Sequence, residues 1–201
     1  MDASKPLRAH SLALPNLLTY GRIAAVPAVV GSMYWQLQHG GNAMRWVALA
    51  IFITAGVTDV LDGYLARAWD QQSSFGRMLD PIADKLLVSS SLLMLAADGT
   101  IGGLSLWAAI VILCREILVS GLREYLAELR VSVPVTRLAK WKTTLQLIAI
   151  GFLIAGDAGD AIVPVVTWTG IMLLWLSALL TIYTGWDYLQ AGLHHLTRED
   201  A

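Results

Sequence analysis

Charged residues are scarce in this chain, and their scarcity limits what the protein can be. Only 14% of its 201 residues are charged and 56% are hydrophobic, whereas soluble domains carry about 25% charged residues. This composition excludes a disordered chain, which has few apolar side chains, and it is atypical of a soluble domain. The formal net charge is −1, so there is no basic excess of the kind that binds nucleic acid.

Cysteine is almost absent. Cys114 is the single cysteine, which excludes an intrachain disulfide and a zinc site built from several thiolates. The four histidines, at positions 10, 39, 194 and 195, have no partners at metal-ligand spacing, so we interpret them as surface residues.

Long apolar runs, in contrast, fill most of the sequence. A helical membrane span needs about 20 mostly apolar residues, and the breaks between the runs are rich in glycine and aspartate, as expected of short turns. The sequence predicts an all-α integral membrane protein with six transmembrane helices over residues 16–190, a cytoplasmic juxtamembrane segment at 1–15 and a cytoplasmic tail at 191–201. The six predicted spans are Asn16 to Gln38, Ala43 to Arg67, Asp80 to Ala97, Leu104 to Leu126, Leu138 to Ala155, and Ala161 to Leu189.

The distribution of lysine and arginine predicts the orientation of these spans. With six spans, both termini and the second and fourth connections share one side of the membrane. The three turns on the opposite side hold only Arg45. By the positive-inside rule, the basic side is cytoplasmic. Its basic residues are Lys5, Arg8, Arg67, Arg77, Lys85, Arg123, Arg130, Arg137, Lys140, Lys142 and Arg198.

Four aspartates gather where the second and third predicted spans meet the cytoplasmic side. If the first segment is helical, Asp59, Asp62, Gly63 and Ala66 fall within an arc of about 100°, so two carboxylates share a face with two small residues. Asp80 and Asp84 form an i,i+4 pair with Cβ atoms about 5–6 Å apart in a helix, and Gly76 lies one turn earlier.

Carboxylates this close repel one another and are costly near a membrane. A hard divalent cation such as Mg²⁺ or Mn²⁺ cancels that repulsion and prefers oxygen ligands. Taken singly, the residues have plainer interpretations: Asp80-Pro81 resembles a helix start, and Arg67 and Arg77 could be cations at the membrane interface. The joint pattern favours a functional site.

The spacing Asp59-x2-Asp62-Gly63-x2-Ala66-Arg67-x8-Gly76-x3-Asp80-x3-Asp84 resembles the signature of the CDP-alcohol phosphotransferase family, with all eight fixed positions filled. The resemblance implies a six-helix membrane enzyme, usually a homodimer. Such an enzyme joins an alcohol to the phosphatidyl group of a CDP-linked lipid and releases CMP.

The resemblance also implies roles for these residues. Asp59, Asp62 and Asp80 would hold two divalent cations, Mg²⁺ or Mn²⁺, with Asp84 close to them and acting as the general base for the acceptor hydroxyl. The residues implied to bind the CDP group are Asp62, Gly63, Ala66, Arg67 and Gly76.

A second group of polar residues lies on the cytoplasmic side of the fourth and fifth predicted spans. Its cations suit a phosphorylated acceptor, because lysine and arginine form charge-assisted hydrogen bonds with phosphate. Arg115 lies deepest in an apolar stretch, where its alternative interpretation is a local ion pair with a neighbouring acid. For Lys140 and Lys142 the alternative is anchoring at the cytoplasmic interface. The candidate acceptor-phosphate residues are Arg115, Arg123, Arg137, Lys140 and Lys142.

Three further motifs resemble one branch of the family, the bacterial enzymes that make phosphatidylglycerophosphate. They are Pro15-Asn16-Leu-Leu-Thr19-x2-Arg22, Arg115-Glu116-x3-Ser120-Gly-Leu-Arg123-Glu124 and Ala139-Lys140-x-Lys142-Thr143. This branch implies CDP-diacylglycerol as donor, sn-glycerol 3-phosphate as acceptor, and a place in the bacterial inner membrane.

Two alternatives remain open at this point. A sibling transferase of the same family could use another acceptor, as the cardiolipin or inositol-phosphate types do. A cation or proton transporter would also carry acids in membrane helices, but it should place them at the midplane or in both halves of the bundle. The one-sided acids favour chemistry at the membrane surface.

Overall fold

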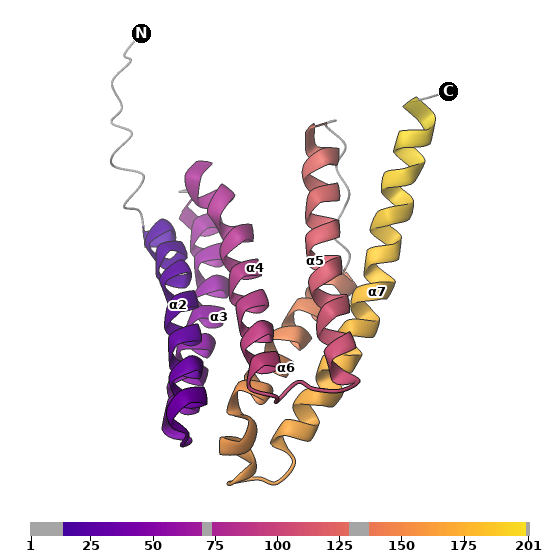
Figure 1. Cartoon of the computed structure of the whole chain (residues 1–201). Coiled ribbons are helices and arrows are strands. Elements are labelled where there is room, and N and C mark those ends of the chain that lie inside the picture. The colour runs from indigo at the N-terminus through magenta and orange to yellow at the C-terminus, as the bar shows by residue number, and fades with distance from the viewer. Residues whose placement is uncertain (1–13, 70–73, 129–136, 200–201) are drawn as a thin grey trace, which may run out of the picture. The chain divides into compact units, whose positions relative to one another are not determined.

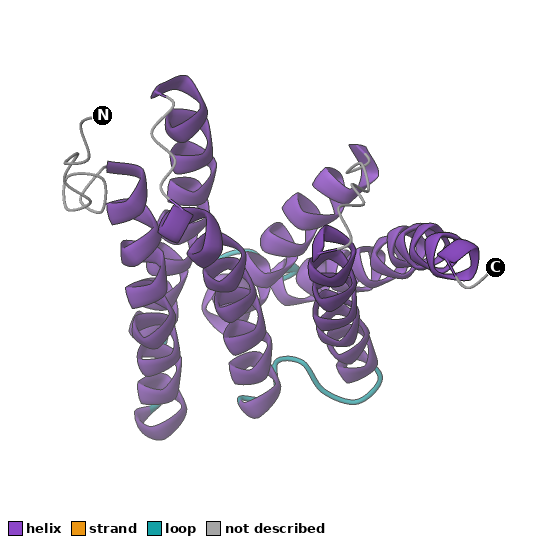
Figure 2. Ribbon diagram, turned by 90° about the horizontal axis from the view of Figure 1, so that it is seen from above, coloured by secondary structure: helices purple, strands orange, loops and turns teal. Residues whose placement is uncertain are grey.

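The computed structural model describes the backbone at residues 14–69, 74–128 and 137–199, and most of these residues are helical. Within these ranges there are six helices and no strand, and Figure 2 shows only helices joined by loops. The helices are α2 (Leu14–His39), α3 (Ala43–Trp69), α4 (Ser74–Ala97), α5 (Ser105–Glu128), α6 (Arg137–Asp160) and α7 (Val166–Glu199). The prediction of an all-α chain is confirmed for the described residues.

Each helix contains the greater part of one predicted span, but the ends differ. Helix α4 begins at Ser74, six residues before the predicted start at Asp80, and it runs through Pro81. The interpretation of Asp80-Pro81 as a mere helix start is therefore wrong. Helix α7 continues to Glu199, past the predicted end at Leu189, because hydropathy marks the apolar stretch and not the helix itself.

Glycines make the turns and one kink. Gly40 and Gly41 connect α2 to α3 with φ angles of 71° and 84°, a region that residues with a Cβ rarely adopt. Gly156 has φ 42° and ψ −129° inside α6. The predicted break after Ala155 is thus a kink, beyond which the helix continues to Asp160.

The chain divides into two compact units, residues 1–94 and 95–201. In the first unit α2 packs along α3, and in the second unit α7 packs against both α6 and α5 (Figure 1). Gly170 permits a close approach of α7 to α6, because a Cβ at that position would lie 2.8 Å from Cγ of Leu153. Small residues at such crossings are typical of helix packing in membranes.

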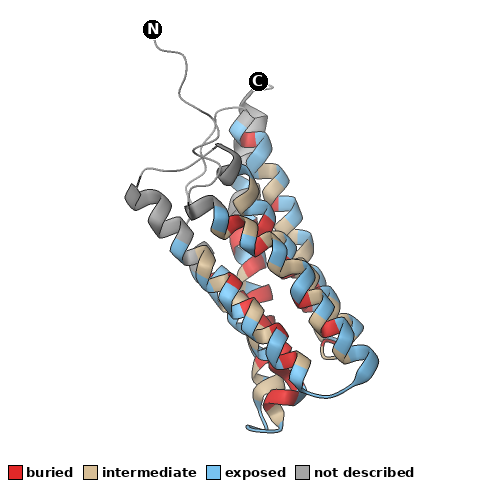
Figure 3. Ribbon diagram, turned by 90° about the vertical axis from the view of Figure 1, so that its left-hand side faces the viewer, coloured by how far each residue is buried: buried red, intermediate tan, exposed pale blue. Residues whose placement is uncertain are grey.

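The core is mostly apolar, but the surface differs from that of a soluble protein. Exposed residues are distributed along the helices (Figure 3). They include large apolar side chains such as Leu104, Ile117 and Trp141, which are 77%, 72% and 70% exposed. Arg22, Arg45 and Lys142, in contrast, are buried. Apolar surface of this extent needs lipid or a partner to cover it, and ionisable groups in membrane helices face protein neighbours.

Two segments of the described chain, Ser105–Ala127 and Val166–Trp186, are long and apolar enough to cross a membrane. They qualify as candidate membrane spans by their length and composition alone. The prediction of six spans goes further than this.

Candidate active site

Helix α2 brings a buried arginine to the predicted acidic site. Nη1 of Arg22 lies 2.6 Å from Oδ1 of Asp59 on α3 and 2.6 Å from Oδ1 of Asp84 on α4. The Arg22 side chain is 0% exposed, whereas those of Asp59 and Asp84 are 35% and 47% exposed. One guanidinium group therefore joins two carboxylates from different helices, and part of each carboxylate remains accessible.

A threonine one turn earlier on α2 holds a third aspartate. The Thr19 hydroxyl donates a 2.6 Å hydrogen bond to Oδ1 of Asp80. Thr19 and Arg22 are three residues apart, so they share a face of α2. Asp80 and Asp84 are both helical in α4, which confirms their predicted i,i+4 relation. We call Thr19, Arg22, Asp59, Asp80 and Asp84 the acidic cluster.

The other residues of the signature belong to the same two helices. The backbone of α3 is helical through Asp62, Gly63, Ala66 and Arg67, and α4 contains Gly76. Their side chains lie outside the described part of the structure. Their roles in holding metal and CDP stay predictions.

The oxygen atoms of the acidic cluster are suitable ligands for a hard divalent cation. Its carboxylate and hydroxyl oxygens are the ligand type that Mg²⁺ and Mn²⁺ prefer. Among the side chains that the structure describes, no group of three or more acidic, histidine or cysteine residues is arranged as a ready metal site. Three carboxylates instead contact Arg22 and Thr19, so α2 supplies positive charge where cations are predicted to bind.

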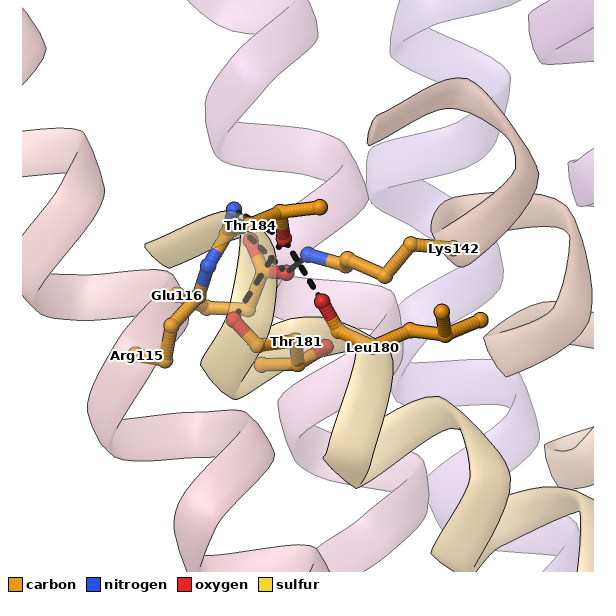
Figure 4. Close-up of polar contacts among 6 residues, drawn as sticks. All are labelled: Arg115, Glu116, Lys142, Leu180, Thr181 and Thr184. Carbon is orange, nitrogen blue, oxygen red and sulfur yellow. Dashed lines mark hydrogen bonds and ion pairs between the residues drawn. The ribbon is translucent and has the colours of Figure 1, made fainter. Parts of the chain in front are cut away.

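A second polar group, the basic cluster, lies within residues 95–201 (Figure 4). Lys142 on α6 donates a hydrogen bond to Glu116 on α5. Nη1 of Arg115 lies 3.6 Å from Oε1 of Glu116, and Nη2 of Arg115 donates a 3.1 Å hydrogen bond to Thr184 on α7. Three helices thus contribute to this cluster, and the Lys142 and Arg115 side chains are only 3% and 13% exposed.

The structure brings some of the predicted acceptor residues together. Arg115 and Lys142 meet at Glu116. The local ion pair considered for Arg115 is therefore present, and the role of Arg115 in binding the acceptor phosphate stays a prediction. Arg123 lies two turns further along α5 and is exposed. Arg137 and Lys140 are in the first turn of α6, with side chains outside the described part.

Sequence reasoning missed the most buried member of the acidic cluster. Arg22 and Thr19 stood in a branch motif without any role assigned to them. The available signal was an arginine inside an apolar run, which needs a partner in a membrane helix. Thr184 was also missed, because its partner Arg115 lies on another helix. Glu116 was named only as a neighbour of Arg115, and its contact with Lys142 on α6 was not predicted.

An apolar cavity of about 370 Å³ lies between α2 and α3. Two of its residues, Gly21 and Thr58, directly precede Arg22 and Asp59, so one end of the cavity adjoins the acidic cluster. The other lining residues are Leu17, Leu18, Ala25, Ala50, Ile51, Thr54 and Ala55.

Comparison with known protein families identifies one that matches most of the chain. The sequence profile of the CDP-alcohol phosphatidyltransferases matches residues 12–183. The chain belongs to this family. The match spans all four signature aspartates, the whole acidic cluster, and Arg115, Glu116 and Lys142 of the basic cluster.

Individual relatives are similar over most of their length. A protein of Rickettsia bellii is 44% identical over 178 residues, which cover 89% of this chain and 94% of the relative. A protein of Cereibacter sphaeroides is 38% identical over 220 aligned residues, which cover 92% of this chain and 98% of the relative. Both are named CDP-diacylglycerol–glycerol-3-phosphate 3-phosphatidyltransferase. A protein of Arabidopsis thaliana, whose name is the same followed by the number 2, is 39% identical. The alignment covers 89% of this chain and 78% of the relative.

Proposed function

We propose that this chain transfers the phosphatidyl group of CDP-diacylglycerol to sn-glycerol 3-phosphate, giving phosphatidylglycerophosphate and CMP in phospholipid biosynthesis. The observation that carries the proposal is the similarity, over about nine-tenths of the chain, to relatives named for this reaction. The acidic cluster supports it, because phosphoryl-type transfer depends on positioning and on neutralising phosphate charge.

The carboxylates of the acidic cluster, together with Asp62, would hold the metal ions, and Asp84 would be the general base. Asp59, Asp62, Asp80 and Asp84 would hold two divalent cations, Mg²⁺ or Mn²⁺, which when bound neutralise charge on the transferring and leaving oxygens. Asp84 takes the proton of the acceptor hydroxyl. The hydroxyl oxygen then bonds to the phosphorus that carries diacylglycerol, and the bond from this phosphorus to CMP breaks. The 47% exposure of the Asp84 side chain leaves it accessible to the acceptor.

The donor lies along the first unit in this proposal. Asp62, Gly63, Ala66, Arg67 and Gly76 bind the CDP group, with small residues that allow the nucleotide to approach the backbone. The apolar cavity between α2 and α3 takes part of an acyl chain, since it adjoins the acidic cluster and is lined mainly by apolar side chains.

The acceptor phosphate binds at the basic cluster. Arg115 and Lys142 present buried positive charge there, and Arg123, Arg137 and Lys140 add cations from the cytoplasmic ends of α5 and α6. Glu116 holds Lys142 and Arg115 toward one another, so the site is organised before the acceptor arrives.

The same proposal includes the membrane arrangement. All six helices span the bacterial inner membrane, both termini are cytoplasmic, and the active site faces the cytoplasm, as the positive-inside distribution favours. A homodimer is expected by family resemblance, and the exposed apolar side chains give a second copy and lipid a surface to cover.

A sibling activity with another acceptor is the second candidate. Assay of the purified full-length protein with CDP-diacylglycerol and a panel of alcohols tests it, with CMP as the readout. We expect CMP release with sn-glycerol 3-phosphate and at most a few per cent of that rate with inositol phosphate or phosphatidylglycerol. Faster release with either of these would reassign the acceptor. Cation transport without CMP release would support a transporter instead.

Substitutions in the basic cluster test the acceptor site. Lys142→Gln and Arg123→Gln should each raise the KM for sn-glycerol 3-phosphate about 10-fold or more, because a hydrogen bond to a charged group contributes about 1.5–3 kcal/mol. The KM for CDP-diacylglycerol should stay within about 2-fold, which controls for general damage. A loss confined to donor binding would move these residues to the donor site.

A further inference from the structure

The position of Arg22 needs an explanation beyond the family signature. It is among the largest fully buried side chains of the described chain, and one of its nitrogens contacts Asp59 and Asp84 at 2.6 Å each. Two oxygens that share this nitrogen are at most about 5 Å apart. Neither Arg22 nor Thr19 belongs to the eight signature positions.

The charges at this point are unequal. Two carboxylates meet a single guanidinium group, and Asp80 close by accepts a hydrogen bond from the neutral Thr19 hydroxyl of α2. Like charges this close in a partly buried site destabilise the fold unless cations compensate them. Arg22 supplies part of that compensation from within the chain.

We propose that Arg22 is a positioning residue and the built-in counter-cation of Asp59 and Asp84. It holds the two carboxylates together when divalent cations are absent and competes with those cations for the same oxygens. This inference rests on the proposed function only for the identity of the cations.

The proposal predicts that removing the arginine makes the fold depend on metal. In Arg22→Gln the two carboxylates repel each other without compensation, so the metal-free protein should be less stable than the unmodified one. Divalent cations then provide the missing charge and meet no internal competitor. Mg²⁺ or Mn²⁺ should therefore stabilise the variant more than the unmodified protein.

The test is thermal unfolding of the full-length protein in detergent, without substrates, in EDTA and in excess Mg²⁺ or Mn²⁺. We expect the Tm of Arg22→Gln in EDTA to fall by about 5–10 °C, and the rise on adding Mg²⁺ to be at least about twice that of the unmodified protein. Arg22→Lys keeps the charge and should respond like the unmodified protein.

Arg45 provides a matched control. It is also a buried arginine of the first unit, but it lies near the start of α3, fourteen residues before Asp59, about 21 Å away along a helix. Arg45→Gln should lower the Tm equally with and without Mg²⁺. A general effect of losing a buried arginine would appear in both variants, whereas a metal-dependent effect should appear only in Arg22→Gln.

A double variant tests the pairing directly. Adding Asp59→Asn to Arg22→Gln removes one of the repelling charges, so the Tm in EDTA should rise above that of Arg22→Gln alone. This comparison of Tm values requires no metal, so it tests the pairing of Arg22 with Asp59 even if metal binding is weak.

Several outcomes would overturn the inference. Equal responses of Arg22→Gln and the unmodified protein to Mg²⁺, or a double variant no more stable than Arg22→Gln, would contradict the role of Arg22 while leaving the proposed function intact. Failure of Arg22→Gln to fold even in Mg²⁺ would also contradict it, since cations would not be replacing the arginine. A protein whose Tm responds to neither cation in any variant would contradict the metal role as well.

Discussion

We expect the Asp84→Asn substitution to abolish CMP release while the protein stays folded. Asparagine has nearly the same shape as aspartate, and its carbonyl oxygen can still accept the hydrogen bond from Arg22 that Asp84 accepts at 2.6 Å. It cannot take a proton from the acceptor hydroxyl. Because general base catalysis contributes about 10²- to 10⁴-fold, we expect a loss of that size or larger in the rate of CMP formation, with the Tm as the measure of folding.

Asp98→Asn is the matched control for this substitution. The Asp98 carboxylate accepts a 2.9 Å hydrogen bond from the backbone amide of Thr100 in the turn after α4, and an asparagine side chain can accept the same bond. This variant should keep its activity and its Tm. If Asp84→Asn retained more than about a tenth of the activity, far above the general base range, the proton would go to another group.

Removing divalent cations is expected to stop the reaction. The acidic cluster offers only oxygen ligands, and Asp59 and Asp84 already pair with Arg22. This arginine therefore does not also neutralise the charge of a lipid diphosphate. With EDTA in excess, CMP formation should fall to background. Added Mg²⁺ or Mn²⁺ should restore it, as expected of charge neutralisation in phosphoryl transfer.

Two controls separate metal binding from simple screening. Sodium chloride at the ionic strength of the added magnesium salt should not restore activity, because screening by salt is not specific to an ion. Asp80→Asn should raise the Mg²⁺ concentration needed for half-maximal activity. An enzyme fully active after exhaustive removal of metal would refute the role of the cations.

The helices could be predicted from the sequence because lipid imposes a simple rule. A span must be apolar over about 20 residues, so six runs gave six helices. The ends of the helices did not follow from the apolar runs, because a helix continues as long as its backbone hydrogen bonds can form. Helix α4 therefore starts at Ser74 and accommodates Pro81, although the apolar run begins later.

The acidic residues could also be predicted, but their partners could not. Helical spacing alone puts Asp80 and Asp84 on one face of α4, and the structure agrees. The contacts of Arg22 with Asp59 and Asp84 join residues 37 and 62 positions apart. No local pattern specifies which face of α2 meets α3 and α4, because that depends on how the three helices pack.

The basic residues show the same limit. The sequence placed Arg115 in an apolar helix and left open whether it had a functional role or a local ion pair. The structure surrounds it with Glu116 from its own helix and Thr184 from α7, and it brings Lys142 from α6 to the same glutamate.

By itself, the sequence determined the helical class, the spacing of the aspartates and the likeness to the family, because these depend on local periodicity and on residue identity at fixed intervals. Only the tertiary structure decided how the charges are paired. Pairing depends on distances between helices far apart in the chain, and in an apolar surrounding each buried charge is stable only where another helix brings its partner.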